Sequence, residues 1–325
     1  MIIDISYGSG GKQTSNMIQE IFMKQYDNEI LRRMEDAAVV QLSGDIAFTT
    51  DSFVVTPVFF PGGDIGRLSV CGTVNDLAMM GAVPKYLTVG FIIETGTDTE
   101  TINTIAYSMK LAAQEADIQI VAGDTKVIEG TGNIYINTAG IGTVIKKGVS
   151  ISNCCEDDMI ILSGNLGDHH ATILSERMGI HNNITSDCAP LGAMVKELID
   201  AGVEIHCMRD ITRGGLATVL NEVAEGSSCG VEIVEKDIPV DREVQGFCNI
   251  LGLDPLYMGN EGKMIAVIPN TQGQKAIEIM KKNKYGTKAQ VIGKIVKGKG
   301  VTMITTIGGS RVVDVLYGEG LPRIC

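Results

Sequence analysis

The last residue of the chain is a cysteine, Cys325, preceded by a short segment (318–324) that contains two glycines and one proline. Glycine loosens the backbone and proline stiffens it locally, so such a segment can swing and still present its tip. Chain termini are usually exposed, and an exposed thiol reacts as its thiolate. Two interpretations remain open: a terminal cysteine without a role, or a thiol carrier that brings a bound group to an active site.

A glycine-rich run near the other end, Gly8-Ser9-Gly10-Gly11-Lys12-Gln13-Thr14, has a composition suited to binding phosphate. Backbone N–H groups that no side chain shields, together with a lysine, attract phosphate oxygens. The run is not a Walker A loop, because Gln13 stands where Ser or Thr should follow the Gly-Lys pair. A flexible loop explains it as well as a phosphate cradle does.

Four aspartates in small-residue surroundings are candidate ligands of a hard cation: Asp36, Asp51, Asp76 and Asp124. Mg²⁺ prefers a few carboxylates together with phosphate oxygens. A single aspartate is more often a turn or cap residue. We expect Asp51 and Asp124 at strand ends, where ligand sites of α/β folds gather, and Asp76 on an apolar helix that ends at Gly81.

Three glycine-containing turns mark the second half, at 163–169, 210–216 and 259–263. The glycines could serve the turns alone. The last turn carries Glu261 between Asn260 and Gly262. A glutamate that is buried there would need a partner or a raised pKa, which suits acid–base chemistry.

The elements that would position these residues alternate between strands and helices without strict order. We expect an α+β chain of two domains with mixed or antiparallel sheets. The polar stretch 146–158, with Cys154-Cys155, marks the boundary between domains 1–150 and 151–317, and 318–325 is the tail. In the first half the predicted strands are 46–55, 87–94, 118–122 and 134–144; the predicted helices are 68–80 and one that starts at a Thr97-x-x-Glu100 capping box. In the second half the predicted strands are 263–269, 290–296, 301–307 and 311–316, and the predicted helices 190–201, 212–224 and 276–282.

Composition excludes several classes of protein. The net charge of −12 over 325 residues argues against a nucleic-acid surface, which needs a basic stripe. The eight cysteines contain no C-x-x-C pair, which argues against a structural zinc site. The first residues have no secretory pattern, and no apolar run reaches the length of a membrane span. We therefore expect a cytoplasmic protein without a membrane partner.

Several motifs together resemble those of the hydrogenase maturation factors of the HypE family, within the superfamily of aminoimidazole ribonucleotide synthetase and selenophosphate synthetase. They occur in order along the whole chain: Gly8 to Gly11, Asp36 to Val39, Thr50 to Ser52, Asn75 to Pro84, Gly123 to Val127, Arg209 to Ala217, Asn260 to Gly262, and the terminal Pro322 to Cys325. Two positions depart from the family pattern. Glu35 stands where a second aspartate is common, which leaves Asp36 open as a metal ligand, and His170 replaces a usual glycine.

The resemblance implies an ATP-dependent carbamoyl dehydratase. The partner HypF would place a carbamoyl group on Cys325, and ATP would phosphorylate its oxygen. Loss of phosphate would leave a thiocyanate, whose cyano group passes to the HypC–HypD complex as an iron ligand of [NiFe]-hydrogenase. The resemblance also implies a homodimer joined through the N-terminal domains.

By position, the resemblance implies the following roles. Cys325 is the carrier, and Lys126 and Glu261 meet the thiocarboxamide. Mg²⁺ is held by Asp51, Asp76 and Asp124. The nucleotide meets Gly8, Ser9, Gly10, Gly11, Lys12, Asp36, Asp51, Asp76, Asp124, Asp210, Thr212 and Gly214.

Two alternatives stay open. One is another ATP-dependent synthetase of the superfamily. Selenophosphate synthetase uses a cysteine or selenocysteine before its glycine loop, whereas the first cysteine here is Cys71. The other is a non-enzymatic thiol or metal carrier whose glycine loops are structural. A carrier needs no ATP, so nucleotide hydrolysis separates the two.

Overall fold

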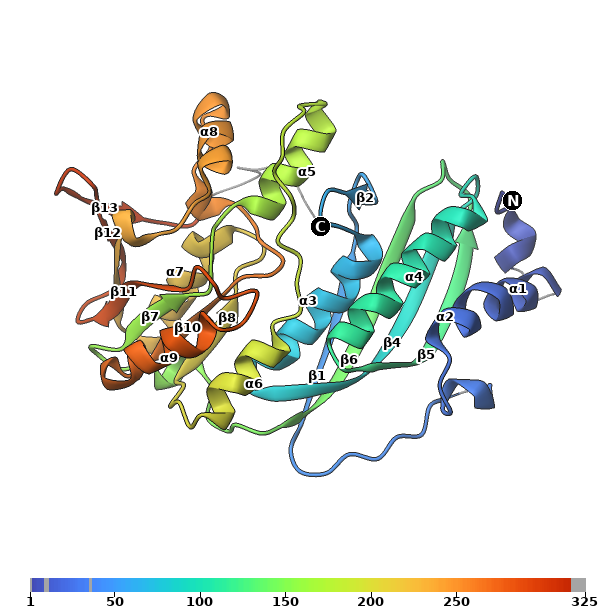
Figure 1. Ribbon diagram of the computed structural model, residues 1–325, viewed down its shortest axis with the longest axis horizontal. Helices are drawn as coiled ribbons and strands as arrows, with labels where there is room; N and C mark the ends of the chain where they lie inside the picture. The colour runs from blue at the N-terminus through green and yellow to red at the C-terminus, as the bar shows by residue number, and fades with distance from the viewer. Residues whose placement is uncertain (1, 9–11, 35–36, 317–325) are drawn as a thin grey trace.

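The computed structural model describes residues 2–8, 12–34 and 37–316, which form two α+β lobes that lie side by side (Figure 1). Cys325, Ser9, Gly10, Gly11 and Asp36 lie outside the described residues. The predicted α+β class with mixed sheets is confirmed. No helix in the described ranges is long and apolar enough to cross a membrane.

The N-terminal lobe is built on a four-stranded mixed sheet with the strand order β1-β6-β4-β5. Its strands are β1 (Ile46–Phe53), β4 (Ala82–Glu94), β5 (Gln119–Ile128) and β6 (Ile134–Val144). The pairs β1–β6 and β6–β4 are antiparallel, and β4–β5 is parallel. A small hairpin of β2 (Phe59–Phe60) and β3 (Gly63–Asp64) leads into the first long helix.

Two long helices, α3 (Ile65–Met79) and α4 (Thr99–Glu115), cover one face of this sheet (Figure 1). Nearly every residue of α3 is buried, because the helix packs on the sheet on one side and on the other lobe on the other. Short helices cover the β5 edge: η1 (Ile5–Gly8), α1 (Lys12–Met17), η2 (Ile18–Met23), α2 (Lys24–Tyr26) and η3 (Leu31–Arg33).

The C-terminal lobe is built on a seven-stranded sheet with the order β13-β12-β9-β11-β7-β10-β8. Its strands are β7 (Met159–Leu162), β8 (Cys207–Asp210), β9 (Gly230–Val234), β10 (Met264–Ile268), β11 (Gln290–Val296), β12 (Gly300–Ile304) and β13 (Ser310–Val313). Because β7 and β8 both pair antiparallel with β10, they run in the same direction on its two sides.

The helices of this lobe form separate apolar clusters. Helices α6 (Gly192–Asp200) and α9 (Gly273–Met280) share one cluster with the sheet, and α7 (Gly215–Ser227) shares another. Helices α5 (Asp168–Met178) and α8 (Arg242–Leu251) pack on each other at the upper edge in Figure 1. Four short helical turns complete the lobe: η4 (Ile151–Asn153), η5 (Glu235–Asp237), η6 (Pro255–Tyr257) and η7 (Asn270–Gln272).

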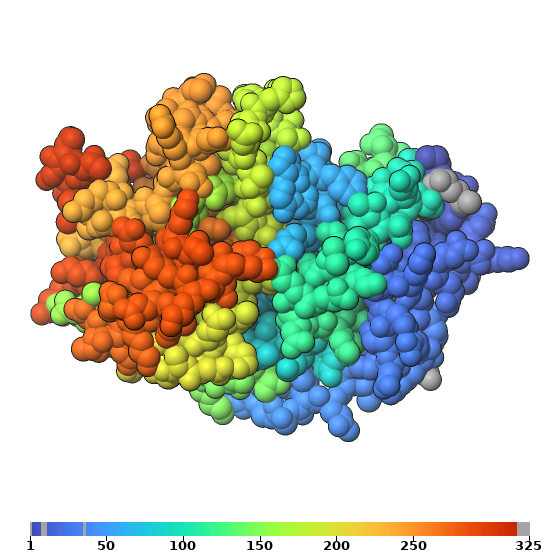
Figure 2. Space-filling view, in the orientation of Figure 1, coloured from blue at the N-terminus to red at the C-terminus, as the bar shows by residue number. Residues whose placement is uncertain are grey.

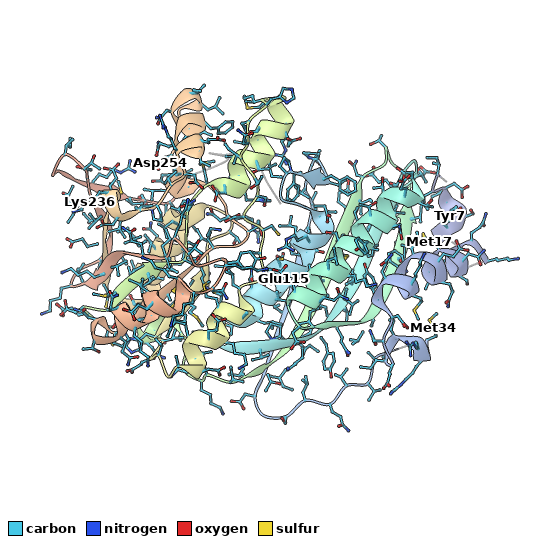
Figure 3. All side chains as sticks on the ribbon, in the orientation of Figure 1. Tyr7, Met17, Met34, Glu115, Lys236 and Asp254 are labelled. Atoms are coloured by element: carbon cyan, nitrogen blue, oxygen red, sulfur yellow. The ribbon has the colours of Figure 1, made fainter. Side chains whose placement is uncertain are left out.

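Buried polar side chains join the two lobes. The Asn75 amide on α3 donates to the Ala189 carbonyl at 3.0 Å and accepts from the Leu191 N–H at 2.7 Å. Nearer the surface, the half-buried Glu115 at the end of α4 binds the exposed Lys284 of the other lobe at 2.5 Å. Figure 3 places Glu115 at the junction, and Figure 2 shows the two lobes in continuous contact there. These contacts fix the position of α3 against the C-terminal lobe.

Two local predictions were wrong. Helix α4 is capped by Asp98, whose carboxylate accepts from the Thr101 N–H at 2.8 Å. The helix therefore begins one residue later than a capping box at Thr97 requires. Strand β5 does not end at Asp124. Pairing with β4 continues to Ile128, so Asp124 lies inside the strand.

Candidate functional site

A cavity of about 240 Å³ lies between the two lobes. Strand β1 and helix α3 form one wall, and β8 with the two turns that follow residues 210 and 259 forms the other. Six ionisable side chains line it: Asp51, Asp76, Arg209, Asp210, Arg213 and Glu261. The fold therefore concentrates ionisable side chains in one cavity at the boundary between the lobes.

The first wall depends on close packing of β1 against α3. In β1, side chains 46, 48, 50 and 52 are exposed, whereas Asp51 alternates with them on the side of the helix. A Cβ on Gly72 would lie 2.9 Å from the Phe53 ring, so glycine is needed for this approach. Asp76 lies four residues after Gly72 and thus on the same helix face. Both carboxylates consequently reach the cavity.

Burial and neighbouring negative charges raise the pKa values of two aspartates in the cavity, Asp76 and Asp210. Burial raises the pKa of Asp76, the hydrogen bond from the Thr49 hydroxyl at 2.9 Å opposes the rise, and the negative charge of Asp51 adds to it. Burial, together with the charge of Asp76, also raises the pKa of Asp210 to about 7. The cavity therefore favours a bound cation, which would relieve the repulsion.

Glu261 is buried, with 4% of its surface exposed, in the turn before β10. Its N–H donates to Asp187 at 3.0 Å, and Asn260 anchors the turn by accepting from the Gly167 N–H at 2.8 Å. A Cβ on Gly262 would lie 1.9 Å from the Asp187 carbonyl oxygen, so this turn requires glycine. Burial, and then the charges of Asp187 and Asp210, raise the pKa of Glu261 well above its ordinary value. Such a carboxyl suits acid–base work.

The donor set of the cavity fits Mg²⁺, which prefers carboxylate oxygens and completes its shell with phosphate oxygens and water. In the part of the chain that the structure describes, no three of these carboxylates bring their oxygens within 4.8 Å of one another. A cation held here would therefore need ligands beyond the aspartates of one chain. Arg209 and Arg213 add the positive charge that phosphate groups require.

Asp124 and Lys126 lie elsewhere. They form an exposed ion pair of 2.7 Å on β5, and the Lys126 ammonium group lowers the pKa of the Asp124 carboxyl. Strands β1 and β5 are opposite edges of the sheet, so one chain does not bring Asp124 to Asp51. The ion pair borders a second cavity of about 350 Å³ with apolar walls that include Phe22, Tyr26 and Phe91. Figure 3 marks Met34, which also lines it, at this end of the molecule.

The remaining predicted residues fall in three places. Gly8 ends η1, and the exposed Lys12 begins α1. Thr212 lines the acidic cavity. Gly214 precedes α7 with a φ of +77°, and a Cβ on it would lie 2.2 Å from the Thr218 hydroxyl, so the backbone there requires glycine.

The comparisons with known proteins agree with this arrangement. The family description "AIR synthase related protein, N-terminal domain" matches residues 34–144, and "AIR synthase related protein, C-terminal domain" matches 156–306. The carbamoyl dehydratase HypE of Azotobacter vinelandii is 45% identical over 99% of this chain and 97% of its own length. The chain belongs to the HypE family of carbamoyl dehydratases. A solved HypE structure also matches nearly the whole chain.

Two solved HypE structures extend the likeness. A hydrogenase maturation protein HypE in complex with ATP has a TM-score of 0.96 and 42% identity, and 99% of each chain is covered. A HypE–HypF complex has a TM-score of 0.81 and 46% identity over 92% of this chain and 99% of that one. In this HypE-family chain the unusual His170 is buried, and its Nδ1 accepts from the Gly259 N–H at 3.2 Å. It thereby supports the turn that carries Glu261.

Sequence analysis did not single out three charged residues of this HypE-family site. Arg209 and Arg213 flank Asp210 within a motif that was recognised, and their charge was a usable signal. Asp187 lies in an irregular segment, where it accepts from the Glu261 N–H and lies 3.2 Å from Lys263. Nothing in its sequence surroundings indicates that role.

Replacing Asp210 by asparagine should stabilise the ligand-free protein. Between about pH 4 and about pH 7, folded Asp210 keeps a proton that the unfolded chain has released, so its contribution to stability is lost as pH rises and the full penalty applies above about pH 7. Asp210 is only half-buried, so we expect a gain of about 1–2 kcal/mol, or a few °C in Tm. Thermal unfolding from acid to mildly alkaline pH measures it, with the exposed Glu129→Gln as control. A gain that does not grow with pH would contradict the assignment.

Proposed function

We propose that this chain dehydrates an S-carbamoyl group on its own Cys325 to a thiocyanate at the expense of ATP. The observation that carries the proposal is the interlobe cavity, where buried Glu261 lies with three aspartates and two arginines. Membership of the carbamoyl dehydratase family supports it. The cyano group would serve as a ligand of the iron in [NiFe]-hydrogenase.

The chemistry needs three contributions from the cavity. The carbamoyl oxygen takes the γ-phosphoryl group of ATP, which converts a poor leaving group into phosphate. The nitrogen loses two protons as the carbon–oxygen bond breaks, which leaves S–C≡N, ADP and phosphate. Glu261 would accept a nitrogen proton in its ionised form, because its raised pKa makes that carboxylate a strong base. Arg209 and Arg213 would bind phosphate oxygens.

Asp51, Asp76 and Asp210 are the residues of this chain that would face Mg²⁺. When bound, the cation would neutralise charge on the transferred phosphoryl group. The chain itself holds these carboxylates close together in a narrow cleft. Binding of a cation there would be favourable because it relieves the repulsion between the carboxylates. Asp124 lies outside this cleft, so it could join these ligands only from a second chain.

The apolar cavity beside β5 is the best place for the adenine of ATP. Its aromatic walls, Phe22, Tyr26 and Phe91, offer ring faces and edges to a planar base. Asp124 and Lys126 at its border are polar groups that could meet the ribose and phosphates. Lys12, which begins α1, follows the glycine-rich run on the same lobe.

We propose a homodimer in which a second copy supplies Asp124 and Lys126 to the acidic cavity. The sheet face that α3 and α4 leave open carries exposed apolar side chains, namely Ile46, Phe48, Ile92 and Ile128. Strand β1 also has an edge that pairs with no other strand among the described residues, and two-fold pairing of such lobes would cover this edge and the open face. This arrangement would bring Asp124 and Lys126 close to Asp51 and Asp76, from which they are separated within one chain.

Mixing two inactive variants tests that arrangement. If Asp76 and Asp124 act together from different chains, a mixed dimer of Asp76→Asn and Asp124→Asn contains one intact site. Random mixing should then restore about a quarter of the wild-type rate. The measurement is thiocyanate formation after co-expression of the two chains. No recovery above the separate variants would mean that both residues act within one chain.

The partners follow from the carrier role. A carbamoyltransferase of the HypF type would load Cys325, and a HypC–HypD complex would accept the cyano group. Nine residues, 317–325, follow Leu316, the last described residue (325 − 316 = 9), and a chain of that length spans at most about 30 Å. That reach suits a thiol that visits a partner and the cavity in turn. The cytoplasm remains the expected location.

The direct test follows the mass of the C-terminal peptide. The chain is incubated with a HypF-type carbamoyltransferase, carbamoyl phosphate and Mg-ATP. We expect the peptide to gain a carbamoyl group and then to lose one water as ADP and phosphate appear. Carbamoylation without the later loss, in the presence of ATP, would refute the dehydratase activity.

A further inference from the structure

A second group of chemically active side chains lies in the C-terminal lobe, away from the acidic cavity. It consists of the Cys155 thiol, the Asp158 carboxylate and the His206 imidazole, and one ligand atom from each lies within 4.8 Å of the others. The proposed dehydration uses none of them. We propose that they form a site for a divalent transition metal, for which Zn²⁺ is the best match.

The topology of the sheet brings the three residues together. Asp158 directly precedes β7, and His206 directly precedes β8. Because these strands run the same way on either side of β10, their starts meet at one end of the sheet, beside the end of β10. The candidate active site lies at the other end of β8, four residues from His206 and about 13 Å away in an extended strand.

Backbone hydrogen bonds hold the ligands in place. The Cys155 N–H donates to the Asp158 carboxylate at 2.7 Å, and the Asp158 N–H donates to the Cys155 carbonyl at 3.1 Å, which closes a tight turn. The His206 backbone is fixed on both sides, since its N–H donates to Val267 and its carbonyl accepts from Ser150. Asp158 is buried, with 4% of its surface exposed, whereas Cys155 is exposed. The site is thus rigid and open on one side.

The imidazole is oriented as a metal ligand requires. Its Nδ1 lies 2.7 Å from the Asp158 carboxylate, on the side of the other two ligands, and its Nε2 lies 3.4 Å from the Glu204 carboxylate. In the metal-free protein Nδ1 donates its proton to Asp158, so binding of a metal would release that proton, and the Glu204 carboxylate at Nε2 would then hold the tautomer whose Nδ1 binds the metal. The backbone of Glu204 is held by its N–H, which donates to the Gln272 side chain at 2.9 Å.

The ligand types select the metal. Thiolate, imidazole and carboxylate together suit Zn²⁺, whereas Mg²⁺ and Ca²⁺ prefer oxygen alone. A tetrahedral zinc sets its ligand atoms about 3.3–3.8 Å apart, so atoms that now lie within 4.8 Å of one another would approach by about 1.5 Å at most, and the 2.7 Å contact between Nδ1 and the carboxylate would widen slightly. The fourth position would be open to water. The spacing rules for zinc sites miss this group because its ligands come from two distant segments of the chain.

Such a metal would join two distant segments of the C-terminal lobe. The segment from Ser150 to Asp158 leads into β7, and His206 directly precedes β8, the edge strand of the same sheet. Bound metal would join the two segments through bonds stronger than the present ion pair. We therefore expect metal to raise Tm as well as to bind.

Cobalt spectroscopy on the full chain tests the proposal. Cys325→Ala is introduced throughout so that the terminal thiol does not contribute. Titration of the metal-free, reduced protein with Co²⁺ should give one equivalent of tetrahedral visible bands with a thiolate charge-transfer band, and Zn²⁺ should displace them. Cys155→Ala should abolish the thiolate band, and His206→Gln should weaken binding more than the tenfold to hundredfold typical of an outer partner. Glu204→Gln should fall within that range.

His181→Gln, at an exposed histidine, is the matched control and should bind as the parent does. Cys155 is an exposed side chain, so its replacement tests the site even where His206→Gln disturbs folding. A cobalt spectrum without a thiolate band overturns the proposal, as does unchanged Zn²⁺ affinity in Cys155→Ala by calorimetry. In either case the group is an ordinary Asp158–His206 ion pair beside a surface thiol.

Discussion

Replacing Cys325 by alanine should abolish the cyanated product completely. The carbamoyl group has no other attachment point on the proposed route, and the residue is the last of the sequence. Nucleotide binding should change little, and Tm should stay within about 1 °C because surface changes typically cost less than about 0.5 kcal/mol. Intact-mass spectrometry after incubation with the carbamoyltransferase, carbamoyl phosphate and Mg-ATP measures the product.

The matched control is Cys229→Ala, which removes a half-buried thiol from the C-terminal lobe and keeps the tail. It should retain the product. A cyanated species in the Cys325→Ala protein would refute the carrier role and point to one of the internal thiols. Peptide mapping would then identify that thiol.

Replacing Glu261 by glutamine should lower kcat about 10² to 10⁴-fold, the range expected for loss of a positioned acid–base group. Glutamine keeps the shape of the side chain in this buried turn, and the Glu261 N–H that binds Asp187 belongs to the backbone. The affinity for Mg-ATP should therefore be preserved, and the Tm should not fall, because glutamine also removes the cost of ionising a buried carboxyl. Single-turnover conversion of the carbamoylated protein measures the chemical step apart from loading.

The pH dependence gives a second readout for Glu261. Burial and neighbouring carboxylates raise its pKa, so the ionised form gains population only as pH rises. If the ionised form is the base, the wild-type rate should climb with pH through that raised pKa, and the glutamine variant should lack this limb. The exposed Glu129→Gln should keep the wild-type profile. A glutamine variant within about threefold of wild type would exclude Glu261 from proton transfer.

Local patterns in the sequence predicted much of the scaffold. The apolar run 68–80, in which Asp76 is an isolated charge, predicts helix α3. The structure buries that helix almost entirely. Helix α6 ends close to Gly202, whose φ of +69° a glycine adopts without strain. The same local reasoning placed Glu261 in a turn and indicated that its burial would matter. Such predictions succeed where the cause lies within a few neighbouring residues.

Short elements escaped the sequence analysis. Strand β8, for example, has only four residues, too few to show a pattern of their own. It forms because it pairs with β10. Asp98 rather than Thr97 caps α4, because the exact start of a helix depends on how the preceding turn packs. Interactions with distant parts of the chain determine both outcomes.

The sequence by itself indicated which residues are candidates for the chemistry, whereas the tertiary structure decided which of them meet. The motif residues Asp51, Asp76 and Asp210 converge because β1, α3 and β8 pack at the boundary between the lobes. Asp124, equally prominent in the sequence, lies at the opposite sheet edge. Long-range strand order depends on the burial of whole faces and on hydrogen bonding between distant segments, and no local pattern encodes it. The same physics placed His206 beside Cys155, fifty-one residues away along the chain (206 − 155 = 51).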